Sequence, residues 1–161
     1  MNDTTKSLLQ TITLPDGSTK QVFKRGSIVF TYGGGIGDFI IHIAQGFRGF
    51  SHCGIALGDG KMIAAWGNVG KVIYQDDLQQ LQTEAIYPLK DPVLVEQMIT
   101  IAKGCLGKPY DYLGLLAVVG VPIGIGGPPK AFFCSSLVAY SMGLHGNDRK
   151  YKPQDLWDLF H

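Results

Sequence analysis

The sequence predicts one domain of the α+β class, and three observations support this prediction. The strand-like runs all lie before residue 90, with one helix-like run among them. Helix-like runs with capping residues follow, and segregated strands and helices are typical of α+β domains. The 161 residues contain no internal repeat and no linker-like tract, and this length suits a single domain.

The first expected element is a β-hairpin. Residues 11–14 and 20–23 alternate in polarity, and Pro-Asp-Gly-Ser at 15–18 supplies the turn between them. This hairpin reads as an addition to the main domain. We therefore divide the chain into an N-terminal hairpin extension, residues 1–24, and a main domain, residues 25–161.

The main domain begins with further strands. Residues 27–31 form a β-rich run, and apolar residues at helical spacing predict a helix over 36–47. Residues 52–57 and 61–66, joined by Gly-Asp-Gly, make the clearest hairpin of the chain. Two more strands are expected at residues 71–74 and 84–89.

A helix is expected to follow these strands. Asp91 suits the N-cap and Pro92 suits the first turn, so the helix begins there. We expect it to end at Gly104 or Gly107. Its predicted buried stripe consists of Val95, Met98, Ile99 and Ala102.

A Gly/Pro-rich apolar segment at 113–127 separates this helix from two shorter ones. A compact, buried helix is expected over 134–142, with Gly143 as its stop signal. The last helix is expected to start at Lys152-Pro153 and to end near Phe160.

The composition excludes several classes of protein. Lys+Arg 14 against Asp+Glu 13 gives a net charge of +1, so no strong field attracts nucleic acid. The 45% of hydrophobic residues can build a core, which excludes intrinsic disorder. The 22 glycines follow no three-residue period, which excludes a collagen-like fibre. We expect no nucleic-acid partner, and we leave open transient contact with a membrane surface and the oligomeric state.

The N-terminus lacks the basic and apolar regions of a secretory signal peptide. The most apolar segment is too short and too rich in glycine to be a transmembrane helix. Three widely spaced cysteines, Cys53, Cys105 and Cys134, do not suggest a disulfide framework, and Cys105 is expected to be structural. A cytoplasmic location is the default prediction, with signal-independent export as the alternative.

The glycine runs and the remaining histidines predict neither a cofactor nor a metal. The GGGIG run at 33–37 lacks the Lys-Ser/Thr of a P-loop, and Asp38 stands where a dinucleotide fingerprint needs glycine. No Cys-x-x-Cys, His-Glu-x-x-His or carboxylate ladder occurs. We interpret His42 and His145 as surface residues.

Cys134 is the strongest candidate for chemistry. Two prolines at 128–129 fix an extended approach, and the expected helix begins at the cysteine itself. Unpaired backbone N–H groups and the positive end of the helix dipole lower the pKa of a thiol in this position. The thiolate is the reactive nucleophile, and a buried structural cysteine is the alternative.

His52 is the expected partner of Cys134. In its strand, Cys53 faces one side, whereas His52, Gly54 and Ala56 face the other. Because Gly54 and Ala56 are small, we expect a helix that presents Cys134 to dock on the His52 face. Cys53 is then a core residue on the opposite side.

Several motifs resemble one family of hydrolases. GKPY at 107–110 and FCSSLV at 133–138 resemble the nucleophile region of NlpC-type papain-like cysteine hydrolases. SHCGIALGDGKMI at 51–63 resembles their histidine hairpin. Here the histidine motif comes first, as in the circularly permuted, YiiX/YebB-like branch. RGSIVF at 25–30 and KPQDL at 152–156 also fit this branch, so the resemblance covers the whole main domain.

The resemblance implies a fold and a reaction. The fold is a papain-like domain in which a small antiparallel sheet or partial barrel packs against helices. Cys134 is then the nucleophile, and His52 is the base that activates it and protonates the leaving group. Tyr110 lies near the nucleophile and donates a hydrogen bond toward the oxyanion, together with the backbone N–H of Cys134. The alternative for Tyr110 is a packing role.

The sequence departs from the family at one position. The family sets a polar third residue on the second hairpin strand, where it orients the imidazole, and that position is Ala64 here. Four alternatives follow: a Cys–His pair suffices, Asn68 takes over, a backbone carbonyl takes over, or activity is weak. Loss of an orienting group in a triad enzyme costs about 10⁴ in rate.

The resemblance implies cleavage of an amide bond in a peptide, a peptidoglycan fragment or an acylated small substrate. One alternative is an acyltransferase or lipid hydrolase resembling the lecithin:retinol acyltransferase branch, although its Asn-Cys-Glu-His motif is not matched at 133–136. Another is a degenerate binding module, which Ala64 favours. The insert at 113–133 is expected to line an acyl groove or form a lid, with a plain core segment as the alternative.

Overall fold

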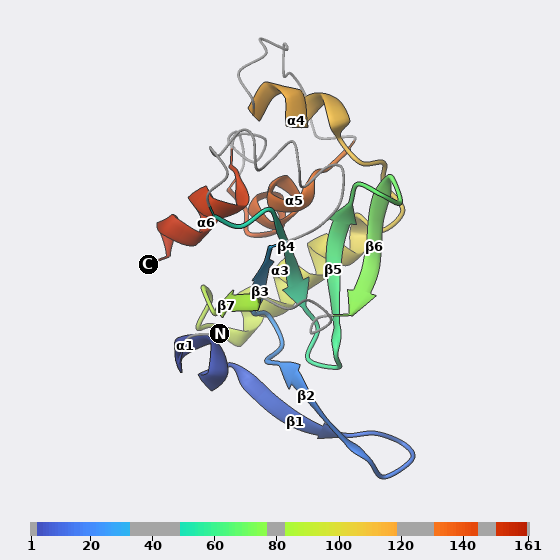
Figure 1. Ribbon diagram of the computed structural model, residues 1–161, viewed down its shortest axis with the longest axis vertical. Helices are drawn as coiled ribbons and strands as arrows, with labels where there is room; N and C mark the ends of the chain where they lie inside the picture. The colour runs from blue at the N-terminus through green and yellow to red at the C-terminus, as the bar shows by residue number, and fades with distance from the viewer. Residues whose placement is uncertain (1–2, 33–48, 77–82, 119–130, 145–150, 161) are drawn as a thin grey trace.

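The computed structural model describes residues 3–32, 49–76, 83–118, 131–144 and 151–160. A five-stranded antiparallel sheet with the order β6-β5-β4-β3-β7 lies at its centre (Figure 1). Its strands are β3 (Ile28–Thr31), β4 (His52–Ala56), β5 (Lys61–Trp66), β6 (Lys71–Asp76) and β7 (Thr83–Ile86). The described helices are α1 (Asp3–Ser7), α3 (Pro92–Gly104), α4 (Tyr112–Val118), α5 (Cys134–Ser141) and α6 (Pro153–Leu159).

This arrangement confirms the α+β class. The strands predicted from the sequence are present, with boundaries that differ by at most three residues. Within the described residues the sheet is open, from β6 at one edge to β7 at the other, and it does not close into a barrel. The helix predicted over 36–47 lies outside the described residues.

The two faces of the sheet bury different sets of residues. One face packs against α3 and α5, which lie behind the strands in Figure 1. Sheet residues buried on this face include Phe30, Cys53, Ile55, Ile63 and Val72. The other face carries a smaller cluster formed by Phe23, Val29, Ala56, Met62, Ala64 and Ala85. The alternation along β4 therefore follows the prediction, because Cys53 and Ala56 fall in different clusters.

Helix α3 confirms its predicted start and buried stripe. The Asp91 side chain accepts a hydrogen bond of 2.8 Å from the Val93 N–H, and this bond satisfies one of the unpaired donors of the first turn. The helix ends at Gly104, one of the two predicted positions. Its buried residues are Val95, Met98, Ile99 and Ala102.

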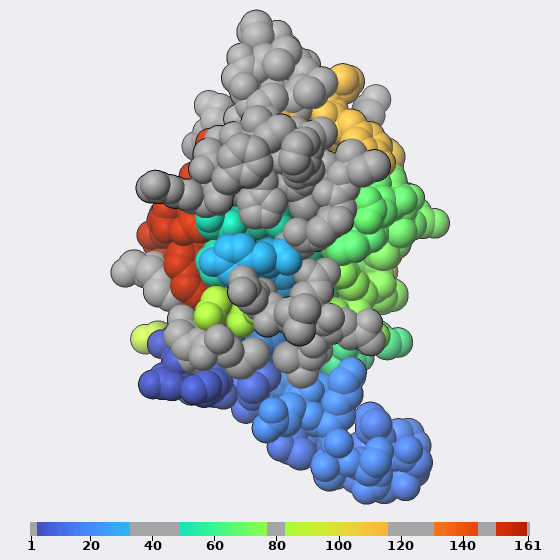
Figure 2. Space-filling model, viewed as in Figure 1, coloured from blue at the N-terminus to red at the C-terminus, as the bar shows by residue number. Residues whose placement is uncertain are grey.

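The N-terminal hairpin is also present, as β1 (Leu9–Thr13) paired with β2 (Thr19–Phe23). Its base is anchored, because Val22 and Phe23 are fully buried and Thr5 Oγ1 accepts a 3.0 Å hydrogen bond from the Ala85 N–H. The rest of the hairpin stands out from the molecule, as the blue region of Figure 2 shows. The extension thus covers the smaller cluster with one end and projects with the other.

Helices α1 and α4 were not predicted. In α4 the Asp111 carboxylate accepts a 2.7 Å hydrogen bond from the Gly114 N–H, which caps the first turn. A Cβ atom at position 114 would collide with this carboxylate, so the glycine makes the cap fit rather than break the helix. Much of the remaining apolar insert lies outside the described residues. Within the described ranges, no helix is both long enough and apolar enough to cross a membrane.

Candidate active site

The cysteine predicted as a nucleophile is the first residue of α5. Phe133 precedes it as the N-cap with an extended backbone, and Cys134 begins the helix as predicted. The Ser136 hydroxyl accepts a 3.0 Å hydrogen bond from the Phe133 N–H and donates one of 2.9 Å to the Phe133 carbonyl. These bonds fix the first turn, so the sulfur lies at the end of the helix where backbone N–H groups have no partner within the helix.

The position of α5 is set by contacts on both sides. Leu137 and Val138 are buried in the cluster that α5 shares with the sheet. On another side, the Ser135 hydroxyl donates a 2.6 Å hydrogen bond to the Tyr151 carbonyl, in the segment that leads into α6. The nucleophile therefore lies on a helix that is packed against the sheet on one side and bonded to the segment before α6 on another.

Strand β4 supplies the other half of the site. Cys134 Sγ lies 3.9 Å from the Ser51 carbonyl oxygen, immediately before the strand. His52 is the first residue of β4, is 2% exposed, and forms a hydrogen bond with the Cys134 side chain. The structure thus brings together the two residues that the sequence predicts as nucleophile and base.

The way in which they meet differs from the prediction. Helix α5 packs on the face of the sheet that carries Cys53 and Ile55, not on the face that carries Gly54 and Ala56. The expectation that the helix docks on the His52 face is therefore wrong. Large apolar side chains determine the docking face, because burying them contributes more than filling the space beside a glycine. His52 nevertheless reaches the sulfur, because it lies at the very start of the strand.

The orienting group is a residue that the sequence reasoning missed. His52 Nε2 lies 3.3 Å from Gln75 Oε1, on β6. An amide oxygen only accepts, so Nε2 is the donor in this contact and carries a proton. Ala64, at the position that the resemblance predicts to be polar, has no side-chain group that could make this contact. A glutamine two strands away does so instead.

Small residues between His52 and Gln75 leave the space in which the two side chains meet. A Cβ atom at Gly54 would lie 3.1 Å from the Ala64 Cβ, so the two small residues are neighbours on the His52 face. They present almost no side chain there, and a longer residue from β6 meets the imidazole instead. The sequence did contain a signal for this residue. In the pairing of β5 with β6, Gln75 lies opposite Met62, and Met62 is on the same face of the sheet as His52. The strand predicted from the sequence ended at Tyr74 and so left Gln75 out.

Trp66 completes the surroundings of the imidazole. Its ring centroid lies 4.8 Å from that of His52, with the ring planes at 82°. Such an edge-to-face contact contributes about 0.5–1.5 kcal/mol beyond area burial. Together with Gln75, it restricts rotation of the imidazole.

The electrostatics favour one thiolate at this site. A hydrogen bond from the Cys53 side chain is the largest factor that lowers the pKa of Cys134 well below its ordinary value. Burial opposes this shift, whereas a hydrogen bond with His52, the charge on His52 and the Cys53 backbone N–H reinforce it. Burial, followed by the contact with Cys134, raises the pKa of Cys53 well above its ordinary value. Of the two thiols, Cys134 is therefore the one that ionises more readily, and Cys53 is the one that favours its protonated form.

This contact adds to the prediction for Cys53. The residue is fully buried in the core, as expected, but its thiol also touches the nucleophile. Cys105 is buried at the C-cap of α3, and burial raises its pKa. All three cysteines are free thiols.

Tyr110 lies in the same buried cluster as Cys134 and is 6% exposed. Its N–H donates a 2.8 Å hydrogen bond to the Gly70 carbonyl, and a parallel bridge joins it to Phe132, two residues before the nucleophile. The backbone therefore places Tyr110 close to the site. A role for its hydroxyl in binding an oxyanion stays a prediction.

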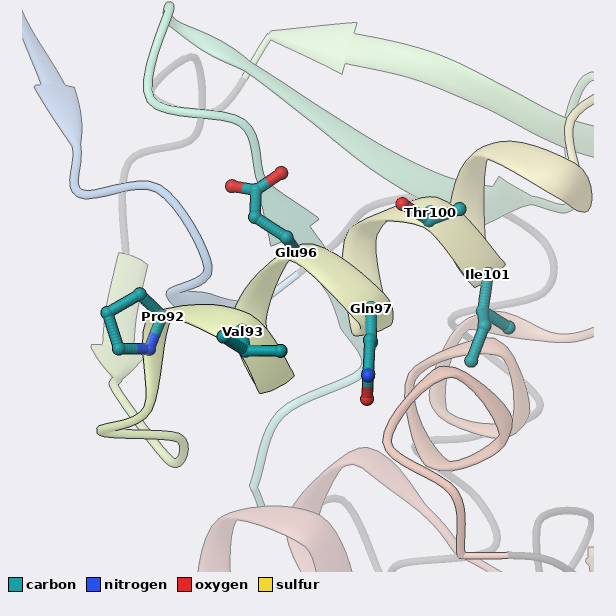
Figure 3. Close-up of a pocket in the computed structure, with 6 residues that line it drawn as sticks. All are labelled: Pro92, Val93, Glu96, Gln97, Thr100 and Ile101. Carbon is teal, nitrogen blue, oxygen red and sulfur yellow. The ribbon is translucent and has the colours of Figure 1, made fainter.

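Two other features have no part in this site. Among the described residues, no three His, Cys, Asp or Glu side chains gather as metal ligands would, and both His42 and His145 lie outside the described ranges. A hollow of about 600 Å³ lies on the outer face of α3 (Figure 3). The described residues that line it are Pro92, Val93, Glu96, Gln97, Thr100 and Ile101. Cys134, His52 and Gln75 are not among these residues, so the hollow is separate from the candidate site.

No protein-family model matches this chain, and comparison with characterised proteins finds no sequence match either. The assignment of chemistry therefore depends on the geometry of the site.

Proposed function

We propose that this protein is a cysteine hydrolase that cleaves an amide bond through Cys134 and His52. The observation that carries the proposal is the chain of contacts from the thiol to His52 and from His52 Nε2 to Gln75 Oε1. A nucleophile, a base and a group that orients the base form the general pattern of nucleophilic catalysis by thiols and hydroxyls. Helix α5 adds backbone donors at the sulfur.

The proposed reaction has two steps. In the first, the Cys134 thiolate attacks the substrate carbonyl carbon, and the oxyanion accepts a hydrogen bond from the backbone N–H of Cys134. Protonated His52 donates its proton to the leaving nitrogen, the C–N bond breaks, and a thioester remains on Cys134. In the second, His52 removes a proton from water, the hydroxide attacks the thioester, and the carboxylic acid leaves as the thiolate re-forms.

Gln75 removes the main sequence argument for an inactive binding module. That argument depended on Ala64, which has no group to hold the imidazole. With an amide oxygen 3.3 Å from Nε2, the imidazole has a fixed tautomer and a fixed plane without help from position 64. The contacts of Cys134 thus support a reactive thiol more than they support an inactive binding module.

Selective alkylation tests the activated thiol. Full-length protein is treated with a small reagent, iodoacetamide, because Cys134 is only 1% exposed. Peptide mass spectrometry then follows Cys134 and Cys105 in the same sample, so Cys105 serves as an internal reference. We expect Cys134 to react first in the wild type, and His52→Ala to reduce its advantage. Equal labelling of the two cysteines in the wild type would refute an activated pair.

The substrate class needs a separate experiment. Wild-type protein and Cys134→Ala are incubated with muropeptides, with N-acyl amides and with acyl esters, and the products are analysed by mass spectrometry. We expect wild-type-dependent cleavage of an amide in the first or second set. Cleavage of esters alone, with acyl transfer to an added alcohol, would favour the acyltransferase alternative. If no set is changed, the amide proposal fails.

A further inference from the structure

Two of the three cysteines are in direct contact at the site. Cys53 lies on β4 and Cys134 begins α5, and both belong to the same buried cluster. Cys134 Sγ lies 3.9 Å from the carbonyl oxygen of Ser51, two residues before Cys53, and the Cys53 thiol beside it lowers the pKa of Cys134. The proposed hydrolysis uses only one of these thiols, so the function of the second is open.

The two thiols differ in how readily they ionise, and disulfide formation through a sulfenic acid requires one thiol that ionises readily. Oxidation begins at a thiolate, and the contacts of Cys134 favour that form. The raised pKa of Cys53 favours its protonated form, which reacts with oxidants more slowly than a thiolate does. A protonated thiol beside a reactive thiolate is the arrangement of a resolving cysteine beside an oxidisable one.

We propose that Cys53 is a resolving thiol, which forms a reversible disulfide with Cys134 after a hydroperoxide has oxidised Cys134. In the first step the Cys134 thiolate attacks one peroxide oxygen, and the O–O bond breaks. Cys134 becomes a sulfenic acid, and the other oxygen leaves, with a proton, as water or an alcohol. In the second step the Cys53 sulfur attacks the Cys134 sulfur and the S–O bond breaks. Hydroxide leaves and combines with the Cys53 proton as water.

The overall balance is two thiols and one hydroperoxide giving one disulfide, one water and one further water or alcohol. The thiols lose two electrons in total, and the hydroperoxide gains them. The disulfide would withdraw the sulfur from His52 and stop hydrolysis. It would also protect Cys134 from irreversible oxidation to the sulfinic acid, and an external dithiol would restore both thiols.

This inference goes beyond the proposed hydrolysis and does not need it. It depends on the contact between the two sulfurs, whatever bond Cys134 cleaves. A disulfide in a protein that hydrolyses nothing would support this inference and sink the proposed function. Hydrolysis without a disulfide would do the reverse.

The experiment treats reduced, full-length protein with a small excess of hydrogen peroxide, after which free thiols are blocked and the intact mass is measured. We expect the wild type to lose two hydrogen atoms, and peptide mapping without reduction to find Cys53 joined to Cys134. Cys105→Ala should behave as the wild type does. Cys53→Ala should instead gain two oxygen atoms at Cys134, and dithiothreitol should not reverse this.

Three outcomes would overturn the proposal. They are sulfinic acid formation at the same rate in wild type and Cys53→Ala, a disulfide that includes Cys105, and a disulfide only between two chains. Cys53→Ser keeps the volume of the side chain and replaces Cys53→Ala if circular dichroism indicates that the alanine variant is unfolded. The serine variant must also fail to form the disulfide and proceed to the sulfinic acid.

Discussion

The Nε2 atom of His52 lies 3.3 Å from the Oε1 atom of Gln75, so an imidazole on β4 is held by an amide on β6. Strand β5 lies between these two strands, and its residue Ala64 leaves room on that face. The third residue of the site therefore comes from a neighbouring strand rather than from the position that the family resemblance indicates.

Loss of the Gln75 amide should slow the reaction of Cys134. A hydrogen bond of this kind has a net value of about 0.5–1.5 kcal/mol. We therefore expect Gln75→Ala to lower the rate of alkylation of Cys134 by roughly two- to tenfold. The measurement is the rate constant for labelling with iodoacetamide at neutral pH, followed at the Cys134 peptide.

Two variants serve as controls for Gln75→Ala. Gln97→Ala removes the same side chain from an exposed position on α3 and should leave the rate unchanged. Gln75→Glu keeps an acceptor for Nε2 and should retain the rate or raise it. If Gln75→Ala and Gln97→Ala react equally fast, the amide does not position the imidazole.

Loss of the Cys53 thiol should change the pH dependence of labelling. Its hydrogen bond is the largest factor that lowers the pKa of Cys134, so the folded thiolate persists below the ordinary thiol range. In Cys53→Ala the midpoint of the labelling profile should move to higher pH, because the thiolate has lost a donor. Cys105→Ala should leave the midpoint where it is, and an unchanged midpoint in both variants would contradict this account.

The lowered pKa of Cys134 also makes the stability of the fold depend on pH. Because the pKa of Cys134 is lower in the folded than in the unfolded state, the thiolate contributes stability above the unfolded value, near pH 8.5. This contribution is lost as the pH falls through the folded pKa. Cys53 has the opposite sign, since its raised pKa costs stability as the pH rises above the unfolded value. Labelling therefore reports on Cys134 more clearly than unfolding does.

Ser136 should stabilise the start of α5. Its hydroxyl accepts the hydrogen bond of the buried Phe133 N–H at 3.0 Å, and Ser136→Ala leaves that donor without its partner. We expect a loss of about 1–2 kcal/mol in the free energy of unfolding in urea. Ser7→Ala removes an exposed hydroxyl that donates to the Thr4 carbonyl and should change stability by less than about 0.5 kcal/mol. Equal effects of the two substitutions would disprove the capping role.

Gly54 should tolerate no side chain. An added Cβ atom would lie 2.9 Å from Met62 Sδ and 3.0 Å from the Ile63 carbonyl oxygen, both too close. Gly54→Ala is therefore expected to cost about 1–3 kcal/mol, as overpacking of a core does. Gly104→Ala is the matched control, because an added Cβ atom there meets nothing within 4 Å. It should leave stability unchanged or raise it by up to about 1 kcal/mol. Similar urea midpoints for both variants would contradict the tight packing.

Local patterns predicted most of the elements, because their causes are local. The cap at Asp91, the alternation around Cys53 and the helix start at Cys134 all depend on residues close together in the sequence. The docking face of α5 depends on which side chains the whole sheet buries, and periodicity within one strand does not contain this information. Identifying Gln75 also required the register between β5 and β6, and the predicted strand ended at Tyr74, two residues before the end of β6.

The order of the residues along the chain affects when the thiol becomes reactive. His52 and Gln75 belong to three consecutive antiparallel strands, β4, β5 and β6, so only a short length of chain must close to bring them together. Cys134 is synthesised later and joins them only when α5 packs on β4. Until that docking, the cysteine has neither the imidazole nor the Cys53 donor beside it. A nascent chain therefore carries an ordinary, slow thiol, and its reactivity appears together with the completed core.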